Sequence, residues 1–164
     1  MYKNPLPVSV GIIPSLTPGH IILVERSDGG TALPGGYVDE LEDAIAAVNR
    51  EVYEETGLEL DGAKWKLFHS SITPDNKLLL FSWYTQAVAV PDSFMPNAEV
   101  VRLFSAPWNT SLKFPLHAAA VERWKNDAEP GWRFISSDSF RCDETPRSEV
   151  FMDRWAALAA PVNR

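Results

Sequence analysis

The chain has 164 residues, 45% of them hydrophobic and 23% charged, and its single cysteine, Cys142, excludes an internal disulfide. A chain of this length can form one domain with a sizeable core, so we predict a single domain over residues 1–164. The net charge of −7 argues against a protein that binds a phosphate backbone through a basic surface alone. The single cysteine makes a reducing cytosol the default, so we expect a cytoplasmic protein. No apolar run reaches the roughly 18 residues of a membrane helix, so we expect no membrane partner.

The first third of the chain predicts three strands, a glycine loop and a helix. β-branched and apolar residues indicate strands at residues 8–13 and 20–25, and a short strand at 31–33. Pro34, Gly35 and Gly36 then form a loop, since glycine adopts backbone angles that other residues avoid. A helix of about fifteen residues follows and ends at Gly57, a residue typical of helix C-termini.

The remainder of the chain predicts further strands and two more helices. We expect strands at residues 64–69, 78–90 and 99–104, a helix at 115–125, a short strand at 132–135 and a third helix at 148–160. A turn at residues 73–76 joins the first two of these strands, which indicates an antiparallel pair. The expected fold class is α/β, with a mixed sheet and helices on its faces.

The helix after the glycine loop carries an apolar face and an acidic face. Its apolar stripe is formed by Leu41, Ile45, Val48 and Val52. Its acidic face is formed by Glu51, Glu54 and Glu55, which are spaced at i, i+3 and i+4. Three carboxylates near a helix C-terminus repel one another and the helix dipole. Such a face either binds a hard cation such as Mg²⁺ or Mn²⁺, or is a solvated surface in which Arg50 pairs with Glu54.

The spacing of the whole segment resembles the Nudix box. Gly36, Glu42 and the run Arg50–Leu58 match the pattern G-x5-E-x7-R-E-U-x-E-E-x-G-U, where U is apolar, at every defining position. The resemblance covers about a seventh of the chain. It implies the family's α/β/α sandwich, with the box as a loop–helix–loop.

The resemblance also implies an enzyme that hydrolyses a nucleoside diphosphate linked to another moiety, with water attacking phosphorus. In this family divalent ions neutralise the phosphate charge, so the expected cofactor is Mg²⁺, with Mn²⁺ as a second choice. The implied metal ligands are Glu54, Glu55, Glu51 and the backbone carbonyl of Gly36. Glu51 is alternatively the group that orients or deprotonates the water. The implied role of Arg50 is to orient these carboxylates, and that of Glu42 is structural support.

Two residues outside the box are further candidates. Glu99 begins a late strand, where some family members carry an extra ligand or base; its alternative is a solvated strand end. Arg26 ends the second strand, before the glycine loop, and could contact a substrate phosphate; its alternative is an ordinary surface arginine.

The substrate is left open by these patterns. ADP-ribose, dinucleotides, nucleotide sugars and nucleoside triphosphates all fit the family, and a small-molecule nucleotide is expected rather than a nucleic acid polymer. Many relatives pair, so a homodimer is consistent with the resemblance. The alternative functions are a catalytically silent nucleotide-sensing or protein-binding module on the same fold, and an acidic domain whose glutamate face binds a partner.

Overall fold

The computed structural model describes residues 3–127 of the chain, which form strands interspersed with helices. The strands are β1 (Leu6–Ile12), β2 (His20–Arg26), β3 (Thr31–Ala32), β4 (Gly35–Tyr37), β5 (Trp65–Ile72), β6 (Lys77–Tyr84) and β7 (Val100–Pro107). The helices are α1 (Ala44–Thr56), the 3-10 helix η1 (Gly62–Lys64) and α2 (Pro115–Asp127). The predicted α/β class is confirmed.

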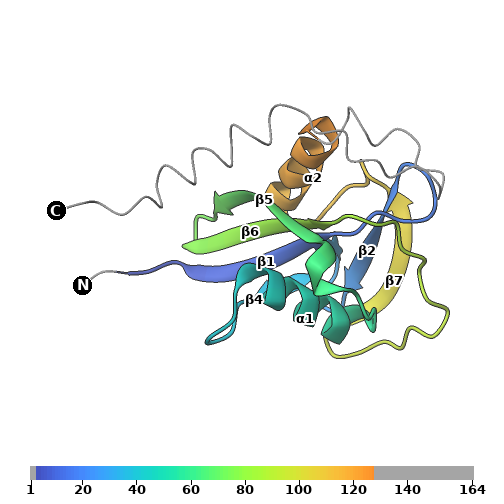
Figure 1. Cartoon of the computed structure of the whole chain (residues 1–164), viewed down its shortest axis with the longest axis horizontal. Coiled ribbons are helices and arrows are strands. Elements are labelled where there is room, and N and C mark those ends of the chain that lie inside the picture. The colour runs from blue at the N-terminus through green and yellow to red at the C-terminus, as the bar shows by residue number, and fades with distance from the viewer. Residues whose placement is uncertain (1–2, 128–164) are drawn as a thin grey trace. The chain divides into compact units, whose positions relative to one another are not determined.

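The strands form two sheets (Figure 1). One has the order β4-β1-β6-β5, in which β1 and β6 are parallel and the outer pairs antiparallel. The other has the order β3-β2-β7 and is antiparallel throughout. The first sheet is therefore mixed, and the expected antiparallel pairing of β5 with β6 is confirmed.

The helices α1 and α2 cover opposite faces of the four-stranded sheet. Gly11 of β1 faces α1, because a Cβ at this position would lie 2.9 Å from Val48 Cγ2. Phe81 of β6 pairs with Val10, and its ring centroid lies 5.8 Å from that of His117 on α2. Since successive strand residues point to opposite faces, the sheet lies between the two helices, as Figure 1 shows with α1 below and α2 above.

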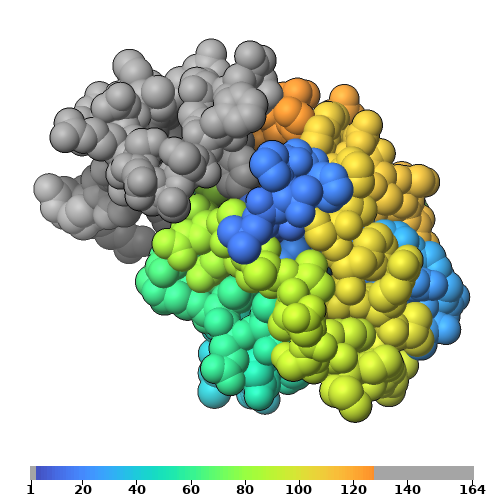
Figure 2. Space-filling model, turned by 90° about the vertical axis from the view of Figure 1, so that its right-hand side faces the viewer, coloured from blue at the N-terminus to red at the C-terminus, as the bar shows by residue number. Residues whose placement is uncertain are grey.

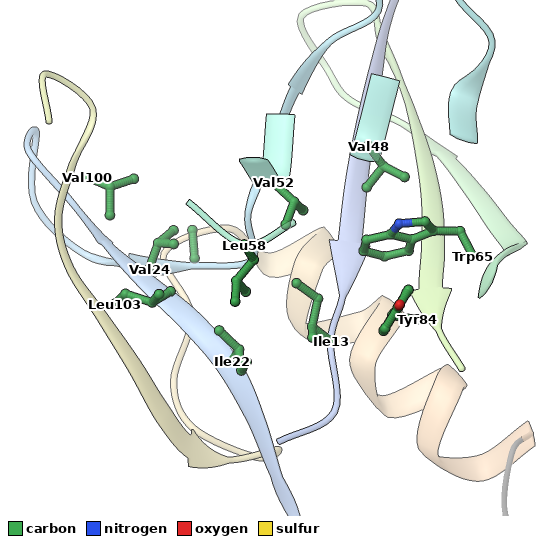
Figure 3. Close-up of a cluster of buried hydrophobic side chains, with 11 residues drawn as sticks. Ile13, Ile22, Val24, Val48, Val52, Leu58, Trp65, Tyr84, Val100 and Leu103 are labelled. Carbon is green, nitrogen blue, oxygen red and sulfur yellow. The ribbon is translucent and has the colours of Figure 1, made fainter. Parts of the chain in front are cut away.

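The core next to α1 joins both sheets (Figure 3). Its buried members are Ile13, Ile22, Val24, Ala32, Val48, Val52, Leu58, Trp65, Tyr84, Val100 and Leu103. Val48 and Val52 supply the helix side of this cluster and are fully buried. The predicted apolar stripe of the helix is thus confirmed at these two positions, and Ile45 packs against the cluster as a partly buried residue.

The helix begins later than predicted. Asp43 caps α1, because its Oδ1 accepts hydrogen bonds from the backbone N–H groups of Ile45 and Ala46 at 2.9 and 2.8 Å. Leu41 lies before this cap with a positive φ of 65° and a fully exposed side chain. Its assignment to the apolar stripe is therefore wrong.

The long strand predicted at residues 78–90 is also too long. β6 ends at Tyr84, and the chain beyond it leaves the ladder. Val88 instead donates to Pro14 O at 2.9 Å and accepts from Leu16 N at 3.1 Å. The glycine loop differs as well, since Gly35 and Gly36 pair with β1 as part of β4. The strand predicted at 132–135 and the helix predicted at 148–160 lie outside the described residues.

Candidate active site

The three box glutamates lie on the last two turns of α1 in very different environments. Glu55 is buried at 4% exposure, and the side chain of Glu51 is 13% exposed. The side chain of Glu54 is 55% exposed. The three carboxylates of the predicted acidic face therefore differ in exposure. Glu55 lies inside the protein, Glu51 at its rim and Glu54 in solvent.

The two glycines of β4 bring backbone against these carboxylates. The N–H of Gly35 donates to Glu55 Oε2 at 2.9 Å. A Cβ on Gly36 would lie 2.5 Å from both carboxylate oxygens of Glu51. Gly35 has a φ of 152°, and a Cβ there would collide with the backbone of Ser9 on β1. Neither position accepts a side chain without a shift of its neighbours.

Arg50 holds the acidic groups of the box together. Its Nε donates to Glu42 Oε1 at 2.8 Å and its Nη2 to Glu42 Oε2 at 2.9 Å, so the pair is bidentate. Its Nη1 donates to Glu51 Oε1 at 2.9 Å and to Glu54 Oε2 at 3.2 Å. Its Nη2 also donates to the carbonyl of Tyr37 at the end of β4 at 2.9 Å. These bonds connect the loop, the strand and the helix of the box.

Burial and mutual repulsion disfavour the charged state of the inner carboxylates. Burial raises the pKa of Glu55 to about 7, and Glu51 and Glu99 add to that shift, although the Gly35 N–H opposes it. Burial also raises the pKa of Glu51, against the lowering effect of Arg50. Carboxylate oxygens concentrated in this way are the donors that hard divalent cations prefer.

The side chains do not stand in a complete metal site. Within residues 3–127, no three Asp, Glu, His or Cys side chains are grouped closely enough to hold a metal ion. Arg50 bonds Glu51 and Glu54 instead. The carboxylate oxygens are chemically suited to a divalent cation. The side chains of Glu51 and Glu54 would have to change conformation to complete a metal site.

The structure brings the two candidates outside the box to the same place. Glu99 lies close enough to raise the pKa of Glu51 and of Glu55, and Arg26 close enough to lower that of Glu55. Arg26 pairs with Val100 across β2 and β7, and the N–H of Ser27 donates to the Glu99 carbonyl at 2.8 Å. The register of this pair of antiparallel strands therefore places Arg26 and Glu99 together beside the end of α1.

Asn97 is a residue of this site that the sequence did not indicate. Its Nδ2 donates to the backbone carbonyl of Glu55 at 3.0 Å. Its Oδ1 accepts from the N–H groups of Glu99 and Val100 at 3.0 and 2.9 Å. Asn97 thus ties the start of β7 to the last turn of α1. The segment before β7, which contains Asn97, is yellow-green in Figure 2 and lies beside the yellow atoms of β7. No local sequence pattern marks an asparagine for such a role.

Two aromatic residues near α1, Trp65 and Tyr84, belong to the core. Trp65 and Tyr84 are 5% and 4% exposed, and their ring centroids lie 5.2 Å apart. Trp65 Nε1 donates to Asn49 Oδ1 at 2.9 Å, which fixes the ring against α1. Neither ring is available to a nucleotide base in this arrangement.

The fold and the box identify the family. A family model for the NUDIX domain matches residues 5–125, which is most of the chain. The chain therefore belongs to the Nudix hydrolase family, as the resemblance of the box predicted. The prediction of one domain over residues 1–164 remains a prediction, since the match ends at residue 125.

The chain is also similar to several known proteins and solved structures. A curated relative, the U8 snoRNA-decapping enzyme of Homalodisca vitripennis, is 45% identical over 51 residues, which are 31% of this chain. The matched part spans 26% of that relative's length. A solved nudix hydrolase family member from Chromobacterium violaceum has a TM-score of 0.61 at 19% identity, covering 96% of this chain and 92% of its own. The C. elegans Ap4A hydrolase also has a TM-score of 0.61, at 14% identity, covering 74% of this chain and 97% of its own. These structures show the shared fold.

No helix within residues 3–127, including α1 and α2, is long and apolar enough to cross a membrane.

Proposed function

We propose that the protein hydrolyses a phosphoanhydride bond in a nucleoside diphosphate linked to another moiety, in a Mg²⁺-dependent reaction. The observation that carries this proposal is the graded set of Glu51, Glu54 and Glu55, packed against the backbone of Gly35 and Gly36. A fold without such a function would gain nothing from burying Glu55 beside other acidic groups, because buried unpaired charge is destabilising.

The metal-binding residues in this proposal are Glu54, Glu55, Glu51 and the carbonyl of Gly36. Mg²⁺ bound there would neutralise charge on the phosphate oxygens and lower the pKa of a bound water. Arg50 orients Glu51 and Glu54 through its hydrogen bonds to both carboxylates. Glu42 keeps Arg50 in place through its bidentate pair. Mn²⁺ suits the same oxygen donors.

The attacking water needs a group that orients it or accepts its proton. Glu51 stands at the rim of the site, where its carboxylate can reach both Arg50 and solvent. Glu99 is the other candidate, as a further ligand or as the base, because it lies beside Glu51 and Glu55. Arg26 offers its guanidinium to a substrate phosphate from the end of β2. The carboxylates would hold the cation while Arg26 binds the anionic substrate.

A substrate panel tests this function. We would measure product formation from ADP-ribose, NADH, a nucleotide sugar, nucleoside triphosphates and dinucleoside polyphosphates, with Mg²⁺, with Mn²⁺ and with a chelator. A capped RNA oligonucleotide belongs in the panel because one relative is a snoRNA-decapping enzyme. Metal-dependent release of a nucleotide product supports the proposal. Nucleotide binding by calorimetry without product from any substrate would support a silent binding module instead.

A further inference from the structure

A small basic cluster lies near the carboxylates, since Arg26 interacts electrostatically with Glu55 and Glu99. It consists of Arg26, Lys113 and the ring of Phe114, with Asp28 between the two cations. Arg26 Nε donates to Asp28 Oδ1 at 2.9 Å, and Lys113 Nζ lies 3.0 Å from the same oxygen. The box sequence gives no hint of this cluster, because Lys113 and Phe114 lie far from Arg26 along the chain.

The cluster is built by the packing of the segment before α2 onto the hairpin of β2 and β3. The N–H of Lys113 donates to the carbonyl of Thr31 at 2.8 Å. The lysine stem crosses the turn at Gly30, where a Cβ would lie 3.0 Å from Lys113 Cβ and Cδ. Gly30 also has a φ of 90°, so both its backbone and its missing side chain suit this crossing.

The ring of Phe114 supports both cations. Arg26 Cζ lies 5.6 Å from the ring centroid and Lys113 Nζ lies 5.7 Å from it, within the range of cation–π contacts. Behind the ring lies His117, whose centroid is 4.9 Å from that of Phe114. Burial, with a smaller contribution from Arg26, lowers the pKa of His117 to about 4, so no competing positive charge arises there at neutral pH.

The charges of the cluster leave room for an anion. Arg26 and Lys113 carry two positive charges, and Asp28 offsets one of them. The Asp28 side chain is 55% exposed, so its ion pairs are of the weak surface kind that a multiply charged phosphate can replace. The charges of Glu55 and Glu99 act on Arg26 and help to raise its pKa, whereas Lys113 pairs with Asp28 on the far side of that ion pair. The order along the surface is therefore carboxylates, Arg26, then Lys113.

We infer that Arg26 and Lys113, supported by Phe114, bind a further phosphate of the substrate, beyond the two joined at the carboxylate site. The substrate class is then a nucleotide with three or more consecutive phosphates, such as a nucleoside triphosphate or a dinucleoside polyphosphate. A diphosphate linked to a neutral sugar would bring no phosphate to Lys113, which would keep its ion pair with Asp28. This inference rests on the proposed function and narrows its substrate.

The test is a binding measurement that depends neither on turnover nor on the nucleobase of the substrate. We would titrate the full chain, with Mg²⁺, with inorganic triphosphate and diphosphate analogues in which methylene groups replace the anhydride oxygens. The expected result is at least about tenfold tighter binding of the triphosphate, the size of one charge-assisted hydrogen bond. Lys113→Ala should remove most of this preference. Lys113→Arg should keep it, because the charge stays in place.

Lys66→Ala is the matched control, since Lys66 is an exposed lysine of β5 in the other sheet. It should bind both analogues as the unmodified protein does. Equal affinity of the unmodified protein for the two analogues, or an unchanged preference in Lys113→Ala, would overturn the inference. If either of these results is obtained and the protein still hydrolyses a diphosphate substrate, the inference fails and the proposed function stands. A triphosphate preference without turnover of any substrate contradicts only the proposed function.

Discussion

Gly36 and Glu51 are in contact across the box, with the carboxylate of Glu51 occupying the place where a side chain at position 36 would begin. A Cβ on Gly36 would lie 2.5 Å from both oxygens of that carboxylate. Gly36 has no positive φ, so alanine can adopt its backbone conformation. The absence of a side chain at position 36 therefore serves the placement of Glu51.

Replacing Gly36 by Ala should displace Glu51 and leave the fold intact. A displacement of about 1 Å in a catalytic group costs on the order of 100-fold in rate, so we expect a loss of that size in kcat/KM. The thermal midpoint should change by only a few degrees. Gly62→Ala is the control, since Gly62 lies outside the box, has no positive φ, and a Cβ there would have Asn49 Nδ2 at 4.0 Å as its nearest neighbour. Unchanged turnover in Gly36→Ala would contradict the role given to this contact.

The buried carboxylate of Glu55 should make the protein less stable at high pH when no metal is bound. Its pKa is about 7 in the folded state, against an ordinary value of 4.5 for a glutamate. The folded state therefore binds the proton more tightly, and stability falls as the pH rises from 4.5 through 7. The ionised group costs up to about 3 kcal/mol above that range.

Glu55→Gln should remove this cost, because glutamine still accepts from the Gly35 N–H. In a chelator at pH 8 the variant should unfold at a higher temperature than the unmodified protein, by on the order of 5 °C. The difference should disappear near pH 4.5. Added Mg²⁺ should stabilise the unmodified protein alone. A variant less stable than the unmodified protein at pH 8 in chelator would show that Glu55 is not an unfavourable buried charge.

The buried His117 should give the stability of the protein a second pH dependence, of opposite sign to that of Glu55. Its Nδ1 is buried without a hydrogen-bond partner in the described structure, and its pKa is lowered from 6.5 to about 4. The unfolded chain therefore takes up a proton that the folded chain does not, and stability is lost as the pH falls from 6.5 to 4. The loss reaches up to about 3 kcal/mol.

His117→Leu should flatten that part of the profile. We would compare chemical unfolding of the variant and of the unmodified protein at pH 7.5 and pH 4.5. The leucine variant should lose less stability on acidification than the unmodified protein does. An equal loss in both proteins would mean that His117 is not the group that titrates.

Asn97 should matter more for turnover than for stability. Asn97→Ala removes the bonds that hold Glu99 and Val100 to the end of α1. We expect a loss of about 1–2 kcal/mol in unfolding free energy and a larger effect on kcat at limiting Mg²⁺. Asn49→Ala is the matched control, because it removes the bond to Trp65 on the core side of α1. If the two variants lose activity in equal measure, Asn97 has only a structural role.

The sequence predicted the local parts of the site because they follow helix spacing. The interval of Glu51, Glu54 and Glu55 placed them near one another, and the cap at Gly57 ended the helix where expected, with Gly57 N–H donating to Tyr53 O at 2.8 Å. Helix spacing does not predict how deeply each carboxylate is buried. Glu55 is buried and accepts a hydrogen bond from the backbone N–H of Gly35 on β4, which is a contact between elements.

The sequence did not predict the parts of the site that depend on sheet register or on contacts between loops far apart in the chain. Arg26 and Glu99 meet through the pairing of β2 with β7, and Lys113 reaches Asp28 through a backbone bond to Thr31. The wrong assignment of Leu41 to the apolar stripe has a local cause, which the sequence indicated only in part. Asp43 is a good cap residue, but the positive φ at Leu41 shows that the preceding loop turns away from the helix.

The most direct test of the account is Mg²⁺-dependent turnover of the best substrate by three proteins. These are the unmodified chain, Glu54→Gln and Glu59→Gln, an exposed glutamate outside the site. The account predicts that the unmodified chain and Glu59→Gln release product with the same dependence on Mg²⁺. It predicts that folded Glu54→Gln loses at least about 100-fold in kcat, as expected for a lost group that acts in the transition state. Full turnover by Glu54→Gln, or turnover by the unmodified chain in chelator, would contradict the assignment of these carboxylates to a metal-dependent hydrolase.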